Sequence, residues 1–415
     1  MSPGRRAWLC LLLSLLFAIG ASAARADVLR LRRDADDLAA ALGRAEDGDV
    51  IELPEGRWAG GVRIEKVVTL RGRGGVIDGR GRGRVLDVVA PGVRLEGLTV
   101  AHSGTNVGRS DACIYLEPTA TGTVVVGNEL LDCAFGIWVH ETRSARIEDN
   151  HVVGREELRP TDRGNGIHLF DASQLVVRGN RVERARDGIY VSATEQSLIE
   201  GNRTTHQRFG IHYMYSYDNT LRGNESEDNT VGFALMESQR LVVEDNVALR
   251  NERNGLLFRD VQDSSIRRNR LERNGSGMFF FSSTGNRIED NVIRHNELGL
   301  KIWAGTRRNV VAGNEIVGNR QQVFYVGAAD QVWGEGGRGN RWGDYLGWDQ
   351  DGDGIGDRPH RADTFSARLI YRYPAAALLL RSPALEMLSH LARGFPLLQA
   401  PTIVDVAPLV EGGRR

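Results

Sequence analysis

The sequence lacks the features that would place it in a membrane or on a nucleic acid. Its 53 Lys and Arg residues form no basic stripe, so nothing indicates binding to a nucleic acid backbone. The one long apolar run, residues 7–19, is shorter than the roughly 20 residues that a membrane-spanning helix needs. Proline is scarce, at 11 residues against 50 glycines. The remaining composition is that of an ordinary globular protein or of a long repeat array.

Residues 1–26 have the pattern of a secretory signal peptide. Arg5 and Arg6 precede the apolar run, and small residues ending in ASAARA follow it before Asp27. An uncleaved membrane anchor is the alternative, and the short run argues against it. We therefore expect export. Removing the segment takes away three arginines and no acid, so the formal charge falls from −1 to −4.

Asparagines recur along the chain at a nearly constant spacing. Nine of them are separated by 22 or 23 residues, with a single step of 30, at Asn128, Asn150, Asn180, Asn202, Asn224, Asn246, Asn269, Asn291 and Asn314. Glycines form a second column eight or nine residues later, and each opens a short apolar strand such as GIYV or GFAL. Self-similarity at a fixed period of this length is typical of a solenoid.

The repeat is too short to hold a helix. Each unit of about 22 residues contains two short apolar strands with Gly or Asn between them, which disfavours leucine-rich and helical repeats. The sequence therefore predicts an all-β fold, a right-handed parallel β-helix over residues 27–340 with coils stacked about 4.8 Å apart. We expect the asparagines to form an internal ladder, because Asn tolerates left-handed backbone and its amide bonds neighbouring backbone.

The two ends of the solenoid need cover. Residues 34–45 predict a short amphipathic helix over the first coil. Residues 341–366 predict a closing segment that resembles a calcium loop. The tail, residues 367–415, predicts a helix that starts at Ser382 and Pro383 and an extended stretch beyond it. This tail is suited to binding a partner, and folding back along the solenoid is the alternative.

The pairing of Cys113 and Cys133 depends on the geometry of the coils. Cys10 is lost with the signal peptide, and an oxidising compartment would allow the other two thiols to pair. Cys113 aligns with Gly136, whereas Cys133 precedes that glycine by three residues. Along a straight strand this offset is about 10 Å, beyond disulfide reach. The sequence therefore predicts free thiols, unless the corner bends the two together.

The strands that follow the glycines predict one outward face rich in rings and soft side chains. Side chains alternate along a strand, so residues two and four past each glycine point away from the core. A face of this composition suggests a surface for a partner or ligand, and cover by the chain's own tail is the alternative. The predicted partner surface comprises Trp138, His168, Phe170, Tyr190, Phe279, Phe281 and Trp303.

The stretch FGIHYMYS places soft metal ligands on this face. His212 and Met214 are outward neighbours on one strand, and Met236 lies one coil beyond Met214, about 5 Å away. An imidazole with two thioethers suits Cu(I). His168 lies two coils from His212, on the order of 9 to 10 Å, which is too far to share one ion. The sequence predicts a transient Cu(I) site, and an ordinary exposed surface is the alternative.

The stretch GWDQDGDGIGD predicts a calcium site. Its aspartates occupy positions 1, 3, 5 and 9 of an EF-hand-like loop, with Gly354 at the sharp turn. Position 12 is His360 where such loops carry a bidentate Glu, so the loop is a variant. A solvated acidic turn is the alternative. The predicted ligands are Asp349, Asp351, Asp353 and Asp357.

An enzyme that cleaves polysaccharides is the alternative function for a secreted β-helix with an aromatic face, which would also suit a carbohydrate-binding protein. Such enzymes use paired acids. The outward columns contain no carboxylate, and Asp187 with Arg186 and Arg208 at a corner is a weak substitute. Catalysis is therefore disfavoured.

Three stretches together resemble the NosD family: GIHYMYS, the ALMES of residues 234–238, and RGNRWGDYLGWDQDGDGIGDRP. The resemblance runs from about residue 28 to the end. It implies a periplasmic, non-enzymatic accessory protein of nitrous-oxide reductase maturation that acts with an ABC transporter. The cargo implied for the copper-sulfide centre is copper or sulfur. A copper chaperone and the reductase itself are the other implied partners.

Overall fold

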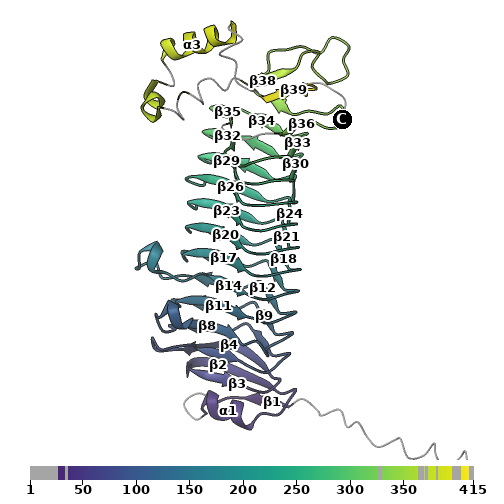
Figure 1. The fold of residues 1–415 in the computed structure, drawn as a ribbon. Coiled ribbons are helices and arrows are strands. Elements are labelled where there is room, and N and C mark those ends of the chain that lie inside the picture. The colour runs from purple at the N-terminus through teal and green to yellow at the C-terminus, as the bar shows by residue number, and fades with distance from the viewer. Residues whose placement is uncertain are drawn as a thin grey trace, which may run out of the picture.

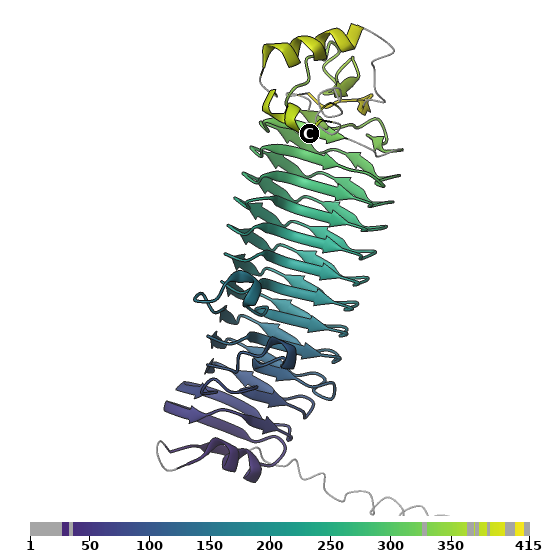
Figure 2. The same cartoon turned by 60° about the vertical axis from the view of Figure 1, so that its left-hand side comes forward.

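A computed structural model of the chain describes residues 27–32, 36–325, 330–362, 369, 373–379, 382–394 and 403–410. The predicted signal peptide lies outside the described residues. The described coils stack along one axis with their strands parallel, and the stack runs from α1 at one end to α3 at the other (Figures 1 and 2). The predicted right-handed parallel β-helix is confirmed.

Each regular coil contributes one strand to each of three faces. Strands of neighbouring coils pair in register, as β17 does with β20 and β20 with β23. The twelve-stranded face comprises β3 (Val62–Ile64), β5 (Leu86–Val88), β8 (Ala112–Leu116), β11 (Phe135–His140), β14 (Ile167–Phe170), β17 (Asp187–Ser192), β20 (Phe209–Met214), β23 (Val231–Met236), β26 (Asn254–Arg259), β29 (Ser276–Phe281), β32 (Leu298–Ile302) and β35 (Gln321–Tyr325).

The other two faces are built from strands of two or three residues. One comprises β6 (Arg94–Glu96), β9 (Val124–Val126), β12 (Arg146–Glu148), β15 (Val176–Arg178), β18 (Leu198–Glu200), β21 (Thr220–Arg222), β24 (Val242–Glu244), β27 (Ser265–Arg267), β30 (Arg287–Glu289), β33 (Val310–Ala312) and β36 (Val332–Trp333). The other comprises β7 (Thr99–Ala101), β10 (Glu129–Leu131), β13 (His151–Val153), β16 (Arg181–Glu183), β19 (Arg203–Thr205), β22 (Glu225–Glu227), β25 (Val247–Leu249), β28 (Arg270–Glu272), β31 (Val292–Arg294), β34 (Glu315–Val317) and β37 (Arg341–Trp342). The two faces meet in the long strands β2 (Val50–Ala59) and β4 (Thr69–Asp78), and β1 (Val28–Arg30) pairs with β2.

The predicted asparagine ladder is confirmed. Each of the nine asparagines donates hydrogen bonds from its backbone and side-chain N–H groups to the side-chain oxygen of the next asparagine, as Asn224 does to Asn246 at 3.0 Å. The backbone explanation is wrong, however. The left-handed residue is the one before each asparagine, such as Gly223 at φ 62° or Asp245 at φ 57°. The asparagine is therefore selected by its amide, which bonds the backbone of the preceding coil and the side chain of the next asparagine.

The ends of the solenoid are covered by chain from both termini. Helix α1 (Leu38–Arg44) confirms the predicted cap: the Asp37 carboxylate accepts the N–H of Ala39 at 2.7 Å, and Leu38 and Leu42 are buried against the first coils. At the far end β38 (His360–Ala362) pairs antiparallel with β39 (Ile403–Asp405). The C-terminal segment 403–410 thus folds back onto the last coils, an alternative that the sequence left open.

Asp405 terminates the asparagine ladder. The ladder continues beyond Asn314 to Asn340, whose backbone N–H donates to the Asp405 carboxylate at 2.7 Å. The indole N–H of Trp342 donates to the same oxygen at 2.8 Å. Asp405 is completely buried, so a carboxylate from the tail receives the last donors of the ladder.

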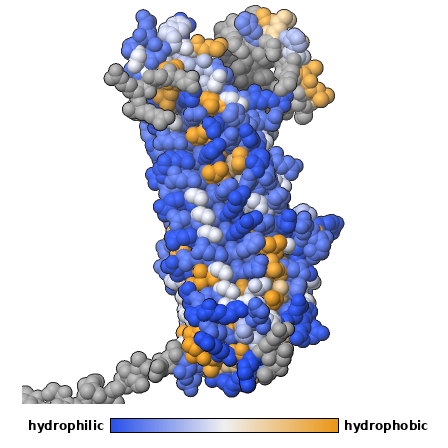
Figure 3. Space-filling model, turned by 180° about the vertical axis from the view of Figure 1, so that it is seen from behind, coloured by the Kyte–Doolittle hydropathy of each residue, from blue (hydrophilic) through white to orange (hydrophobic). Residues whose placement is uncertain are grey.

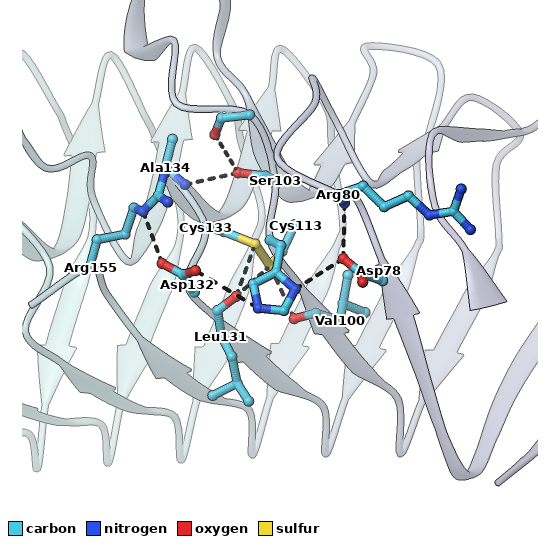
Figure 4. The surroundings of a disulfide bond; sticks show 12 residues. Asp78, Arg80, Val100, Ser103, Cys113, Leu131, Asp132, Cys133, Ala134 and Arg155 are labelled. Carbon is cyan, nitrogen blue, oxygen red and sulfur yellow. Dashed lines mark hydrogen bonds and ion pairs between the residues drawn. A yellow bond between two sulfur atoms is a disulfide. The ribbon is translucent and has the colours of Figure 1, made fainter. Parts of the chain in front are cut away.

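Cys113 and Cys133 form a disulfide, so the prediction of free thiols is wrong (Figure 4). Their Cα atoms are 5.6 Å apart. The 10 Å estimate assumed a straight strand, whereas Asp132 adopts a left-handed conformation at φ 52° and bends the chain at the corner. Both sulfur-bearing side chains lie in the buried core between neighbouring coils.

The remaining described segments lie at the side and the end of the stack. Residues 154–164 form the insertion with the short helix η2 (Pro160–Asp162), which projects from the coils (Figure 1), and η1 (Val107–Arg109) lies in an earlier loop. Beyond the solenoid lie η3 (Pro374–Leu379) and α3 (Pro383–Gly394), which begins where the sequence predicts. No described helix is long and apolar enough to cross a membrane. Seen from behind, the middle coils are largely hydrophilic (Figure 3).

Candidate metal site on the outward face

The register of the twelve-stranded face is the one that the sequence predicts. Ile211 and Tyr213 point inward and are fully buried in the core. The first outward column runs through Trp138, His168, Tyr190, His212, Ala234, Leu257, Phe279 and Lys301, paired strand by strand. The second outward column runs through His140, Phe170, Ser192, Met214, Met236, Arg259 and Phe281. Trp303, predicted to continue this column, follows β32 directly.

The first outward column is covered by its own neighbours. The ring centroids of Trp138 and His168 are 3.8 Å apart, and Tyr190 lies 4.8 Å from both His168 and His212. These contacts leave His168 and His212 buried, with 8% and 6% of their surface exposed. The side chains of this column point outward, as predicted, but the two histidines are not exposed. Close stacking of coils lets adjacent rings cover one another.

His212 is held by the buried carboxylate of Asp187 from the preceding coil, which also pairs with Arg208. Its Nδ1 lies 3.0 Å from Oδ2 of Asp187, and the guanidinium of Arg208 donates to both oxygens of the same carboxylate at 2.9 and 2.7 Å. Burial raises the pKa of Asp187, but the hydrogen bonds from His212 and Arg208 outweigh this effect and bring the pKa below its usual value. Nε2 of His212 is buried and has no hydrogen-bond partner.

Two thioethers lie beside this imidazole. Met214 is two residues along the same strand, and Met236 is its register partner on β23. Met236 is buried and Met214 half-buried, and both pack in one apolar cluster with Phe209. The Phe209 ring also contacts the His212 ring, with centroids 4.7 Å apart. The structure therefore places the three predicted copper ligands in one neighbourhood of the outward face.

His168 has a different environment. Its Nδ1 lies 3.2 Å from the amide nitrogen of Asn165, and its Nε2 is buried without a partner. Burial lowers the pKa of His168 to about 3, so the imidazole stays neutral. Tyr190 separates it from His212. This arrangement agrees with the prediction that the two histidines do not share one ion.

The predicted partner surface is only partly accessible. Phe170 and Phe281 are the most exposed of its rings, at 38% and 37%. Near the C-terminal end of the solenoid, the ring centroids of Trp303 and Phe279 are 6.3 Å apart, and the Lys301 ammonium lies over both rings. This group is separated from the ring stack of the earlier coils by the small or aliphatic residues Ala234 and Leu257 of the first outward column.

Three of the four predicted calcium ligands come together. Ligand atoms of Asp349, Asp351 and Asp353 lie within 4.8 Å of one another. The N–H of Asp353 lowers the pKa of Asp351, but the charge of Asp353, desolvation, and the hydrogen bond and charge of Asp349 together raise this pKa above its usual value. Asp357 instead accepts the N–H of Gln350 at 2.7 Å. His360, at the twelfth position, stacks on Trp342 with centroids 4.8 Å apart and belongs to the buried end of the solenoid.

The outward face does contain carboxylates, in coils that precede the glycine column. Asp87 pairs in register with Tyr115, and Glu117 directly follows that strand. Arg84 binds both, at 3.2 Å from Asp87 and 2.7 Å from Glu117, and its guanidinium lies 3.2 Å from the Tyr115 ring centroid. The sequence does not reveal this pair, because the early coils lack the Asn and Gly columns that set the register. Both carboxylates are engaged by the same arginine.

Comparison with known proteins identifies the family. A model described as "Periplasmic copper-binding protein (NosD)" matches residues 148–347, and one for a right-handed β-helix region matches residues 87–194. A protein of Pseudomonas aeruginosa named "Probable ABC transporter binding protein NosD" is 40% identical over 98% of this chain and 96% of its own length. The chain belongs to the NosD family. A NosD of Stutzerimonas stutzeri with the same name is 39% identical over 86% of both chains.

Solved structures support the fold of this NosD-family chain and no more. The receptor-binding tailspike of bacteriophage Det7 has a TM-score of 0.57 at 10% identity, covering 82% of this chain and 80% of its own. An α-1,3-glucanase from Streptomyces thermodiastaticus has a TM-score of 0.54 at 17% identity, covering 71% and 62%. Such different proteins share the solenoid, so the activity has to be argued from the site.

Proposed function

We propose that the protein is a periplasmic, non-enzymatic factor that handles Cu(I) during the maturation of nitrous-oxide reductase. It acts with an ABC transporter, receives copper from a chaperone, and passes it on for the copper-sulfide centre of the reductase. Membership of the NosD family, the description of the family as copper-binding, and the names of the two relatives support this proposal.

The observation that carries the proposal is the buried, unpartnered Nε2 of His212, on the strand that also holds Met214 and next to the strand that holds Met236. Leaving a buried polar atom without a partner costs free energy, roughly 1–3 kcal/mol, so it calls for a ligand. Imidazole and thioether are soft, neutral ligands, and this combination suits Cu(I) better than it suits hard divalent cations. Copper is the cargo in this proposal, bound during transfer and then released.

A Cu(I) titration against a competing chelator tests the site. The double variant Met214→Leu with Met236→Leu removes both sulfurs at nearly constant volume, and we expect its affinity for Cu(I) to fall at least tenfold. Met278→Leu is the matched control, because Met278 is fully buried inside the core and should leave the affinity unchanged. Equal affinities of the wild type and the double variant would refute a site at these residues.

The biological role has a separate test. A strain without this gene should make nitrous-oxide reductase that lacks a complete copper-sulfide centre, and the full-length protein should restore the centre. The spectrum of the purified reductase reports the result directly. A reductase with a full centre in the deletion strain would contradict the role in maturation, even if the protein binds Cu(I).

For the transporter we propose a docking surface on the C-terminal helices. Leu378 and Leu379 of η3 and Met387, Leu388 and Leu391 of α3 are exposed large apolar side chains outside the solenoid. Exposed apolar side chains that form a continuous patch are typical of an interface, and Leu388 and Leu391 lie three residues apart on one side of α3. Leu388→Glu together with Leu391→Glu should abolish co-purification with the transporter and leave Cu(I) affinity unchanged. Retained co-purification would place the contact elsewhere.

A further inference from the structure

Asp187 and His212 belong to neighbouring coils but form one buried unit. Asp187 opens β17 and has 1% of its surface exposed, and His212 lies on β20 of the next coil. The carboxylate has three hydrogen bonds: Oδ1 accepts one from Nε of Arg208, and Oδ2 accepts one from Nη2 of Arg208 and one from Nδ1 of His212. An ionised carboxylate only accepts hydrogen bonds. The proton of the neutral imidazole therefore resides on Nδ1.

The position of this proton decides what His212 can bind. A neutral imidazole has one N–H and one lone pair, so a proton on Nδ1 leaves the lone pair on Nε2. Nε2 is the atom that is buried without a partner. Histidines that bind metals typically donate the other ring N–H to a carboxylate, which fixes both tautomer and ring orientation. Asp187 stands in this relation to His212.

His168, in the same outward column, shows the opposite arrangement. Its Nδ1 faces the NH2 group of Asn165, which is a donor, so this nitrogen carries the lone pair and Nε2 carries the proton. The two histidines therefore present different atoms on the same face. A carboxylate in one coil and an amide in another distinguish a metal ligand from a hydrogen-bond donor.

We infer that Asp187, held by Arg208, is a positioning residue for the copper site: it keeps His212 in the Nδ1–H tautomer, so that the Nε2 lone pair is available to Cu(I). This inference rests on the proposed function and adds residues outside the predicted ligands. The bidentate pair with Arg208 also occupies both carboxylate oxygens, so Asp187 supports the site without becoming a ligand.

Asp187→Asn tests the inference with little change in shape. Arg208 still needs an acceptor, so the amide oxygen turns to the guanidinium and the NH2 group turns to Nδ1 of His212. Nδ1 then has to accept, and the proton moves to Nε2. We expect Cu(I) affinity to fall about 10- to 100-fold, the range typical for losing the support of a metal ligand.

Asp218→Asn is the matched control. Asp218 forms the same bidentate pair with an arginine, Arg240, at 2.7 and 2.8 Å, and it lies exposed at a corner. This variant should keep the Cu(I) affinity of the wild type. An equal fall in both variants would show that loss of an ion pair, and not loss of the tautomer, causes the effect, and would overturn the inference.

Nitrogen NMR of the copper-free protein separates the inference from the proposed function. Long-range 1H–15N correlations distinguish the tautomers, and His212→Gln assigns the signals among the nine histidines of the full sequence. We expect Nδ1–H in the wild type and Nε2–H in Asp187→Asn. Nε2–H in the wild type would overturn the inference without a variant having to fold. The expected tautomers in a protein that binds no Cu(I) would overturn the proposed function alone.

Discussion

The corner with the asparagine ladder and the outward face with the ring stack treat buried polar groups in opposite ways. In the ladder each amide is paired on both sides, for example Asn246 with Leu221, Asn224 and Asn269. On the outward face the indole N–H of Trp138 and Nε2 of His168 and His212 are buried without partners. A region whose buried polar groups are all hydrogen-bonded contributes to stability, whereas buried polar groups without partners indicate a surface that binds a ligand or another protein.

This division explains how one coil can serve two purposes. Stacking is secured by the ladder, the core and the parallel strands, so the outward side chains are not needed to hold the register. The face can then vary from coil to coil, from Tyr190 to His212 to Ala234, without loss of the solenoid. The comparison predicts that mutations at the corner act on stability and that mutations on the face act on binding.

The largest effect is expected for Asn246→Ala. Its amide donates to the carbonyl of Leu221 at 2.8 Å and accepts the N–H of Asn224 at 3.0 Å, all in the buried core. Two backbone groups lose a partner, at roughly 1–3 kcal/mol each, so the free energy of unfolding should fall by about 4 kcal/mol. Denaturant unfolding measures this fall. The exposed Gln262→Ala, one coil further, is the control, and a similar small loss in both would contradict the role of the ladder.

A somewhat smaller effect is expected for the disulfide. The ladder begins at Asn128, and Cys113 and Cys133 join the coils on either side of this beginning. Their separation of 20 residues predicts a loss of about 3 kcal/mol when both become alanine. Unfolding under oxidising conditions measures it. Reductant should lower the stability of the wild type toward that of the variant, and a reductant without effect would mean that the bond does not stabilise the fold.

The predicted calcium loop lies outside both regions, and it allows a test of whether this end of the solenoid binds an ion. Bound Ca²⁺ at 100 times its Kd would add about 2.7 kcal/mol to the stability of the segment that holds it. We expect Ca²⁺ to raise the thermal midpoint of the C-terminal end and Asp349→Asn to abolish the rise. Asp344→Asn, outside the group of three aspartates, is the control. Identical midpoints with Ca²⁺ and with a chelator would leave a solvated acidic turn.

The periodic parts of the molecule were predictable because their cause is local and repeated. The spacing of Asn224 and its equivalents, with the alternation around His212, is sufficient for the fold, the ladder and the outward register. The disulfide was missed because the bend at Asp132 is a single event that no period reveals. The support of His212 by Asp187 was missed because it joins two coils at different positions along their strands.

A second asparagine ladder was not predicted, although its signal is present in the sequence. Five asparagines repeat every 22 or 23 residues, at Asn229, Asn251, Asn274, Asn296 and Asn319. The backbone N–H of each donates to the side-chain oxygen of the next, as in the first ladder. Reading each corner for its own period would have found them. The burial of His212 needs the third dimension, because the ring contacts with Tyr190 and Phe209 depend on rotamers and not on spacing.

The smallest stability effect is expected where the largest binding effect is proposed. Met214→Leu with Met236→Leu conserves volume in the cluster with Phe209, so the free energy of unfolding should change by less than about 1.5 kcal/mol. Asn246→Ala should do the reverse, with lower stability and, at temperatures where it remains folded, an unchanged affinity for Cu(I). Measuring both quantities on both variants separates the corner from the face. If the methionine variant lost as much stability as the asparagine variant, the sulfurs would be part of the packing, and the division between the two regions would not hold.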